Sequence, residues 1–346
     1  MNNYTEPSLE VLGNPPLLSV SGLQKHFPMR RSFVQRVQGQ PSRSVKAVDG
    51  VDFEIQRGET LGLVGESGCG KSTTGRCVLF LQRPTAGEVR FNGEQINPDD
   101  AGELRRRRRQ MQIVFQDPNS SLNPRMTVGQ TLEEAVAFHD IAPREKRRYV
   151  VEELLETVGL SKAHRGRYPN ELSGGQRQRV GIARALAVNP ELIVADEPVS
   201  ALDVSVQAQI LQLLETLRSE RGLSYLFISH DLGVVRHIAD QVAVMYLGKI
   251  VETGPTSSLF STPLHPYTKA LLSAAPVTNP KRRKTRIILE GDPPSAVDPP
   301  SGCRFRTRCQ FAREQCSIEE PMLRQLSSSH RVACHFAEIL ASGRSS

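Results

Sequence analysis

Hydrophobic and polar positions alternate with different periods along the chain, and each period predicts a different kind of element. The period is two over Leu17–Leu23 and Val51–Ile55, which predicts strands, and Glu88–Ile96 reads as another strand. A polar interruption lies between residues 29 and 44. From residue 192 to residue 252 strand and helix patterns alternate, which is typical of a parallel α/β sheet. We therefore expect an antiparallel β region beside a parallel sheet.

Between these two regions the pattern turns helical, from residue 117 to residue 189. Arg144–Leu160 shows it most clearly, because its apolar residues recur at helical spacing, with Pro143 near the start and Gly159 near the end. This stretch predicts a helical subdomain.

A glycine-rich run joins a predicted strand to a predicted helix. The apolar stretch Leu61–Val64 leads into the run, and Ser72–Leu81 reads as the helix that follows. The run matches G-x-x-x-x-G-K-[ST], in which glycines let backbone N–H groups point into a phosphate-binding nest. Lys71 would place a point charge against the β- and γ-phosphates, and the Ser72 hydroxyl would ligate Mg²⁺. The candidate nucleotide-binding residues are Gly65, Glu66, Ser67, Gly68, Cys69, Gly70, Lys71, Ser72 and Thr73.

A second glycine-rich run and an acidic strand end follow farther along. The run consists of Ser173, Gly174, Gly175 and Gln176. It precedes the predicted helix Arg177–Leu186, and backbone N–H groups at a helix N-terminus, together with the helix dipole, form an anion site. The apolar strand Leu192–Ala195 then ends in Asp196 and Glu197.

In this order the three runs resemble the ATP-binding cassette of ABC transporters, and the likeness covers most of residues 17–255. The resemblance implies that Asp196 holds magnesium, directly or through water, and that Glu197 polarises the attacking water. It also implies that His230 is the switch histidine at the γ-phosphate, and that Gln116 is the Q-loop glutamine that senses magnesium. Any one of these residues alone has an ordinary structural explanation, but their order and spacing favour the catalytic one.

The implied fold is α/β: a P-loop NTPase cassette with a RecA-like parallel sheet, an antiparallel β flank and a helical subdomain. In this family the second glycine-rich run, the signature, faces the γ-phosphate held by the P-loop of another subunit. Ser200–Asp203 resembles the D-loop, which places Asp203 at the same dimer interface. This sequence contains one cassette, so the resemblance implies that the second cassette is another chain.

One aromatic residue of the β flank in such cassettes stacks on adenine. Phe27 is the candidate here. The interruption after it displaces the usual spacing, so a core phenylalanine is the alternative interpretation.

The sequence changes character after Gly254. His265–Leu272 (HPYTKALL) resembles the C-terminal extension of dipeptide and oligopeptide importer ATPases, as do the wording GESGCGKST and the run Ser121–Arg125. The resemblance implies ATP and Mg²⁺ as ligands, and as partners a second ATPase subunit, two permeases and an extracytoplasmic binding protein. Relatives that carry nickel, opines or oligosaccharides remain alternatives. Exporter motors and soluble ABC ATPases of DNA repair or translation fit less well, since fused membrane helices, a second cassette and a long coiled-coil insertion are not visible.

Four of the six cysteines lie in this last part of the chain, separated by five, six and seventeen residues: Cys303, Cys309, Cys316 and Cys334. Four thiolates can bind zinc tetrahedrally or a 4Fe–4S cluster. The spacing is not that of a zinc ribbon, and the family resemblance implies an iron–sulfur cluster; zinc and unliganded thiols are the alternatives. The nucleotide motifs lie outside this region, so we expect ATP binding to be independent of these cysteines.

Composition adds limits to this picture. Lys and Arg number 44 against 37 Asp and Glu, a formal net charge of +7. This balance suits a protein beside anionic lipids as well as one that binds nucleic acid, and we interpret the run Arg105–Arg109 as a solvated face. No apolar stretch is long enough to span a bilayer, and no signal peptide is visible. We expect a peripheral protein on the cytoplasmic face of a bacterial inner membrane, attached through the permeases, with no nucleic-acid partner. The expected division is a disordered segment 1–16, a nucleotide-binding domain 17–255 and an extension 256–346.

Overall fold

The fold is built on two β-sheets. The computed structural model describes residues 15–29, 43–117, 121–274, 287–289, 291–327 and 329–341. Among these residues, one sheet has the strand order β2-β1-β4-β5 and is antiparallel, and the other has the order β11-β12-β10-β9-β3-β8-β7-β6. The strands are β1 (Leu18–Pro28), β2 (Ser44–Ile55), β3 (Thr60–Val64), β4 (Ala86–Phe91), β5 (Glu94–Gln95), β6 (Met111–Val114), β7 (Leu192–Asp196), β8 (Ser224–Ser229), β9 (Gln241–Tyr246), β10 (Lys249–Pro255), β11 (Arg324–Gln325) and β12 (Arg331–Val332).

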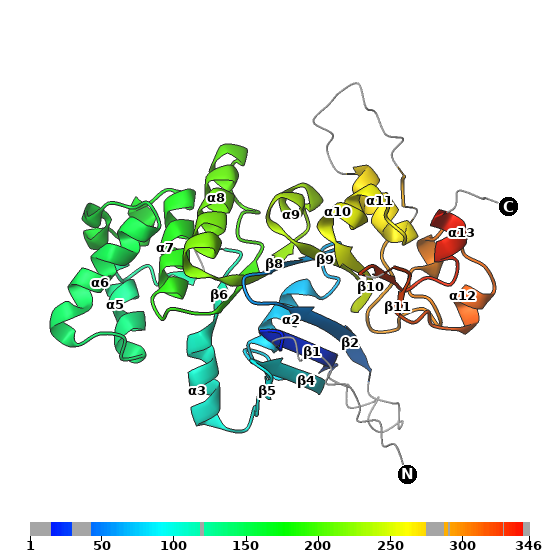
Figure 1. Ribbon diagram of the computed structural model, residues 1–346, viewed down its shortest axis with the longest axis horizontal. Coiled ribbons are helices and arrows are strands. Elements are labelled where there is room, and N and C mark those ends of the chain that lie inside the picture. Colours follow the sequence, from blue (N-terminus) through cyan, green and yellow to red (C-terminus); the bar gives the residue numbers. More distant parts are fainter. Residues whose placement is uncertain are drawn as a thin grey trace, which may run out of the picture.

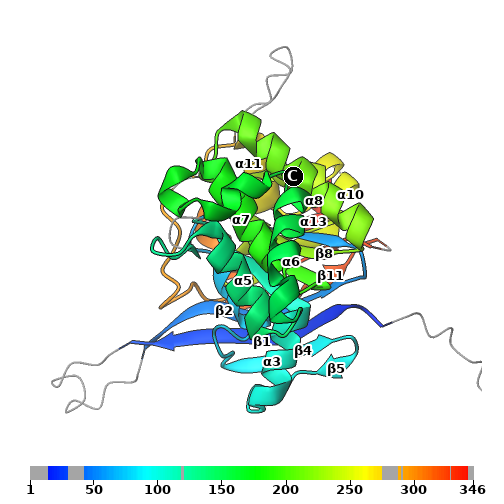
Figure 2. The same ribbon diagram turned by 90° about the vertical axis from the view of Figure 1, so that its left-hand side faces the viewer.

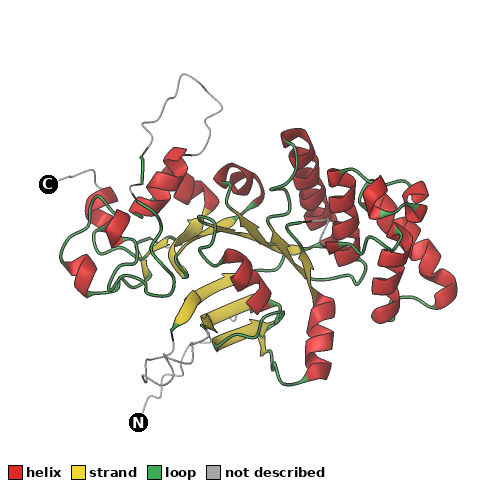
Figure 3. Ribbon diagram, turned by 180° about the vertical axis from the view of Figure 1, so that it is seen from behind, coloured by secondary structure: helices red, strands yellow, loops and turns green. Residues whose placement is uncertain are grey.

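Helices surround these sheets, most of them on one side of the longer sheet, whereas the antiparallel sheet lies on the other side (Figure 3). The α-helices are α2 (Lys71–Val78), α3 (Ala101–Gln110), α5 (Val128–Phe138), α6 (Arg144–Thr157), α7 (Gly174–Leu186), α8 (Val204–Arg221), α9 (Leu232–Ile238), α10 (Thr256–Ser261), α11 (Pro266–Ala274), α12 (Gln315–Ile318) and α13 (Ala337–Ala341). Three short 3-10 helices are η1 (Lys162–Gly166), η2 (Pro169–Glu171) and η3 (Arg306–Arg308). None of the helices in these ranges is long and apolar enough to cross a bilayer.

The middle of the longer sheet is parallel, as the strand–helix alternation predicts. Strands β9, β3, β8, β7 and β6 pair in parallel with one another, whereas β10 pairs antiparallel with β9. Every residue of β3, β7 and β8 is buried, since helices or the antiparallel sheet cover both faces. The order β3-β8-β7-β6 places the carboxyl ends of these four strands side by side at one edge.

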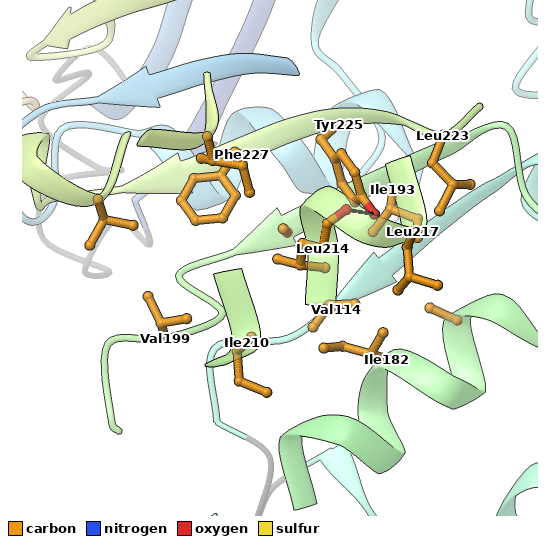
Figure 4. Packing of buried hydrophobic residues seen from close by; sticks show 14 of the residues in the cluster. Val114, Ile182, Ile193, Val199, Ile210, Leu214, Leu217, Leu223, Tyr225 and Phe227 are labelled. Atoms are coloured by element: carbon orange, nitrogen blue, oxygen red, sulfur yellow. Dashed lines mark hydrogen bonds between the residues drawn. The ribbon is translucent and has the colours of Figure 1, made fainter. Parts of the chain in front are cut away.

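Two apolar cores hold the layers together. One joins the antiparallel sheet to α2 and to the near face of the longer sheet, and it includes Leu63, Cys77 and Val194. The other lies on the far face and continues into the helices. Figure 4 shows part of it, where Ile210 and Leu214 of α8 and Ile182 of α7 pack near Tyr225 and Phe227 of β8. The Tyr225 hydroxyl donates to the Leu214 carbonyl at 3.2 Å, so this buried phenol keeps a hydrogen-bond partner.

The helical subdomain and the C-terminal extension lie at opposite ends of the molecule. Helices α5, α6 and α7 form one end, and α11 to α13 lie at the other (Figure 1). Seen from the helical end, the antiparallel strands pass beneath these helices (Figure 2). Helix α5 begins with a reciprocal capping box between Thr127 and Gln130, which satisfies orphan N–H groups at its first turn.

The extension is not a separate appendage, because it contributes β11 and β12 to the longer sheet next to β10. The fully buried carboxylate of Glu252 in β10 fastens it. This carboxylate accepts the backbone N–H groups of Leu264 and His265 at 2.7 and 2.9 Å and contacts His330 Nε2 at 2.8 Å. A boundary at residue 255 therefore divides the sequence but not the sheet.

The α/β cassette fold predicted from the sequence is confirmed, with differences at the ends of elements. The predicted strand over residues 88–96 is a hairpin, because Asn92 and Gly93 have φ of 54° and 79° and form its turn. Helix α7 begins at Gly174, three residues earlier than expected, because Ser173 and Gln176 cap it reciprocally. The predicted disorder of residues 1–16 falls outside the described residues except at Pro15 and Pro16.

Candidate functional site

The candidate site lies where the four parallel strands end. Strand β3 leads into the phosphate loop, β7 ends at Asp196 before Glu197, β8 ends one residue before His230, and β6 ends shortly before Gln116. In open α/β sheets, ligands bind outside the carboxyl ends of strands, where loops from neighbouring strands meet. The sheet order brings together residues that are far apart in the sequence.

The phosphate loop has the backbone that a nest requires. Gly65, Gly68 and Gly70 have φ of 156°, 79° and 112°, and all three values favour glycine. A side chain at Gly70 would also collide with the carbonyl oxygen of Ala47 in β2. Lys71 is 4% exposed, and its ammonium donates to the carbonyls of Gly65 and Glu66 at 2.8 and 3.0 Å. The backbone carbonyls of the loop therefore hold the Lys71 ammonium on the inner side of the loop.

Ser72 and Asp196, predicted as magnesium ligands, are in contact. The Ser72 hydroxyl donates to Asp196 Oδ1 at 2.7 Å, and Arg76 lies 3.8 Å from Oδ2. Asp196 is only 1% exposed, and its Oδ2 atom is buried without a hydrogen-bond partner. Burial raises the pKa of Asp196 despite the opposing effects of Ser72 and Arg76. A buried carboxylate oxygen that lacks a donor, beside a hydroxyl, fits a hard divalent cation that prefers oxygen ligands.

The three predicted catalytic residues meet at one carboxylate. Gln116 Nε2 donates to Glu197 Oε2 at 3.0 Å, and His230 Nδ1 lies 3.1 Å from the same oxygen. Glu197 has a φ of 46°, which is uncommon for a residue with a Cβ, and its N–H donates to the Ile228 carbonyl at 3.0 Å. The tight turn after β7 therefore directs the carboxylate toward the Q-loop and the switch histidine.

These groups surround one open cavity of about 590 Å³. It is large enough for a phosphorylated ligand, and its lining residues are Ala47, Ser67, Gly68, Gly70, Lys71, Ser72, Thr73, Gln116, Glu197, Ser200, Ala201 and His230. Phe27 is not among them. It lies near the end of β1, paired with Val45, with Lys25 over its ring at 5.0 Å. Its contact with adenine stays a prediction.

The signature run does not line this cavity. Ser173 is exposed at the N-terminus of α7, where its hydroxyl accepts the Gln176 N–H at 3.3 Å. Asp203 is exposed at the start of α8, and Val204 beside it is 81% exposed. A helix N-terminus that faces solvent next to an exposed apolar residue suits contact with a second subunit.

The four cysteines of the extension converge on a second cavity. It is small, about 20 Å³, and Cys303, Cys309, Cys316 and Cys334 all line it together with Phe305 and Phe336. Burial raises the pKa of Cys303 to about 12 and that of Cys309 to about 11, so these thiols are neutral near pH 7. Within the described residues, no group of three or more potential ligands is arranged to hold a metal ion. Four thiols are a suitable set of ligands for a metal group, but they are not arranged as a metal site in this structure.

Several residues of the nucleotide site are absent from the sequence-based list. Ala47 forms a wall of the cavity from β2, and Arg76 faces Asp196 from α2. Tyr267 and Arg308 contact Glu66 from the extension. The motif that contains Tyr267 stands out in the sequence, but nothing in the pattern indicates that it touches the phosphate loop.

Comparison with known proteins agrees with this geometry. The model of the family described as ABC transporter matches residues 48–200, and that of the oligopeptide/dipeptide transporter C-terminal region matches residues 251–316. The chain is 52% identical over 322 residues to the oligopeptide transport ATP-binding protein AppF of Bacillus subtilis, covering 92% of this chain and 97% of that one. It is 49% identical over 325 residues to the dipeptide transport ATP-binding protein DppF of Haemophilus influenzae, covering 94% and 98%.

A solved structure is similar as well. It is the dimeric post-hydrolysis state of an ATP-binding cassette bound to ADP and Pi, with a TM-score of 0.60 and 32% sequence identity. The match covers 69% of this chain and 98% of that chain.

The contacts of Glu197 lead to a prediction about catalysis. Glu197→Gln should leave ATP binding intact, because Lys71 and the loop backbone are unchanged, while hydrolysis should fall by roughly 10²–10⁴, the usual effect of losing a positioned general base. Phosphate release by the assembled complex and equilibrium ATP binding measure the two effects. Glu215→Gln, an exposed change in α8, is the control. Turnover near that of the unmodified complex would remove Glu197 from its assigned role.

Proposed function

The chain belongs to the ATP-binding proteins of the ABC transporter family, and we propose that it drives the import of dipeptides or oligopeptides. The observation that carries this proposal is the combination of the phosphate loop, Gln116, Glu197 and His230 around one cavity with an extension of the peptide-transporter type. Relatives at about half identity over nearly their whole length are named as oligopeptide and dipeptide transport proteins. Nickel, opines and oligosaccharides are the competing cargoes.

The residues of the cavity have distinct roles in this proposal. Lys71 and the loop N–H groups hold the phosphates, and Ser72 with Asp196 would hold Mg²⁺, which neutralises charge that develops on the phosphoryl oxygens. Glu197 orients the attacking water and accepts its proton, while Gln116 and His230 fix the carboxylate from two sides. Because both hold the same oxygen of Glu197, a displacement of either one would change the direction of the carboxylate.

We further propose that the active unit is a head-to-tail dimer with a second ATPase subunit. Ser173 of the signature run is exposed, the run does not line the chain's own nucleotide cavity, and the similar solved cassette is dimeric. Two permeases and an extracytoplasmic binding protein would complete the importer, and the permeases would hold this chain at the cytoplasmic face of the membrane as a peripheral subunit.

We also propose that Cys303, Cys309, Cys316 and Cys334 hold a 4Fe–4S cluster. Support comes from the convergence of four thiols on one apolar cavity and from the chemistry of this donor set. The cluster would be structural, because metal–thiolate binding contributes folding free energy to a segment with little apolar core of its own. Assembly would require loss of the thiol protons and a rearrangement of the four side chains.

Cargo is tested by uptake into vesicles that contain the assembled transporter. We expect ATP-dependent accumulation of a labelled dipeptide or oligopeptide, and none with Lys71→Ala in this subunit. Nickel and an oligosaccharide serve as the competing cargoes. Uptake of one of these alone would contradict the peptide assignment and leave the motor role in place.

The dimer is tested by comparing two variants in the assembled complex. Lys71→Ala should abolish nucleotide trapping at this chain's own loop, because the phosphate charge loses its counter-ion. Ser173→Arg should spare that loop and impair hydrolysis at the partner's. The control is Thr127→Arg, which breaks the same kind of capping box at the start of α5. Identical trapping patterns for Lys71→Ala and Ser173→Arg would argue against the head-to-tail arrangement.

The metal group is tested on anaerobically purified protein. It should be brown, with broad absorption near about 400 nm and about four irons per chain, as expected for a thiolate-bound cluster. Cys→Ser at any of the four positions should remove the colour, whereas Cys77→Ser in α2 should retain the iron. Stoichiometric zinc without iron would replace the cluster by zinc, and the absence of both metals would contradict the proposal.

A further inference from the structure

The phosphate loop is held from outside the cassette at a single residue, Glu66. Its backbone N–H donates to the hydroxyl of Tyr267 in α11 at 2.8 Å. Its carboxylate accepts a hydrogen bond from Arg308 in η3, also at 2.8 Å. Both partners belong to the extension, 201 and 242 positions farther along the chain. Glu66 is therefore hydrogen-bonded through its backbone to α11 and through its side chain to η3.

The two partners are themselves firmly placed. The Tyr267 side chain is fully buried, and its ring packs edge-on against Tyr246 of β9 and tilted against Phe305, with centroids 4.7 and 5.4 Å away. The Arg308 side chain is 8% exposed and that of Glu66 is 27% exposed, so their ion pair is largely shielded from water. A charge-assisted hydrogen bond in such surroundings is stronger than one on an open surface.

Glu66 in turn holds the lysine that meets the phosphates. Its carbonyl accepts the Lys71 ammonium at 3.0 Å and the Cys69 N–H at 3.3 Å. The orientation of this one peptide therefore links the extension to the charge on Lys71. The N–H of Glu66, occupied by Tyr267, is not directed at the cavity, and Glu66 does not line it.

A second contact from the same turn supports the other wall of the cavity. Arg304, 8% exposed, pairs with Asp49 of β2 and donates to the Leu247 carbonyl at 2.5 Å. Asp49 lies two residues after Ala47, whose carbonyl limits the space at Gly70. The segment between Cys303 and Cys309 thus contributes two arginines that contact the borders of the phosphate site. Arg308 binds the phosphate loop at Glu66, and Arg304 binds β2 at Asp49.

We propose that Tyr267 and Arg308 are positioning residues for ATP binding, which act by fixing Glu66 and, through it, the phosphate loop and Lys71. A loop held in its binding geometry loses less conformational freedom when the ligand binds. ATP binding is expected to be independent of the four cysteines, whereas this proposal makes it depend on two other residues of the extension. The proposal rests on the ATP-binding role alone and does not depend on the cargo or on the metal group.

The test is a double-mutant cycle on the full chain, measured as the Kd for Mg-ATP. Arg308→Gln and Glu66→Gln should each weaken binding by about three- to tenfold, the effect expected for a partly buried charged hydrogen bond. The double variant should be no weaker than the worse single variant, because both changes remove the same interaction. The matched control is Arg306→Gln, in the same turn, whose guanidinium bonds to Ser301 within the extension and should leave Kd within about twofold.

Two further variants separate positioning from folding. Arg308→Lys keeps the charge and should recover part of the lost affinity, and Tyr267→Phe keeps the ring but removes the acceptor of the Glu66 N–H, so it should weaken binding as well. In the assembled complex, Arg308→Gln should raise KM for ATP by the same factor as Kd while kcat changes little.

The outcomes are distinguishable. An Arg308→Gln Kd equal to that of Arg306→Gln, or losses that multiply in the double variant, would overturn the proposal. Failure of the unmodified chain to bind ATP, with no difference from Lys71→Ala, would instead overturn the ATP-binding role itself. If Arg308→Gln does not fold, the other two variants provide the test. An unchanged Kd in both Arg308→Lys and Tyr267→Phe would then overturn the proposal.

Discussion

Parallel pairing of β3, β8, β7 and β6 is the constraint on which the rest of the structure depends. The register sets Val64 beside Ser229 and Asp196 beside Ile228, so that the loops after these strands leave the sheet at the same level. Strands buried on both faces cannot slip, because a shift by one residue would move each side chain to the opposite core. The phosphate loop, the Asp196 carboxylate and His230 are thereby placed by the same hydrogen bonds that build the sheet.

Catalytic geometry at Glu197 follows from that constraint and adds a local cost. The residue adopts a left-handed backbone, which for a residue with a Cβ is unfavourable by about 1–3 kcal/mol. The hydrogen bond from its N–H to the Ile228 carbonyl and the two side chains at its carboxylate stabilise this conformation. The backbone strain therefore occurs at the residue whose carboxylate contacts both Gln116 and His230. The signature run does not line the nucleotide cavity, and its Ser173 is exposed to solvent.

The C-terminal extension is part of the same construction. It adds β12 to the longer sheet, is fastened at the buried Glu252 carboxylate, and reaches the phosphate loop at Glu66. Its four cysteines surround one small cavity directly beside Phe305 and thus close to the aromatic cluster that places Tyr267. The stability of this segment and the geometry of the nucleotide site are therefore physically connected, even though sequence motifs assign them to different regions.

The sequence by itself determined the cassette, the order of its elements and most of the residues around the cavity, because these depend on local signals, but it did not indicate Ala47. A glycine loop with Lys71, an apolar strand that ends in Asp196 and Glu197, and a glycine-rich run at Ser173 before a helix are each recognisable over a few positions. The pattern over residues 88–96 predicts one strand, whereas Asn92 and Gly93 divide it into a hairpin. Only the tertiary structure decided that Tyr267 and Arg308 meet Glu66, and that four cysteines share a cavity. Such contacts join residues up to 242 positions apart, and they follow from the order of strands in the sheet and from side-chain packing, which no local pattern encodes.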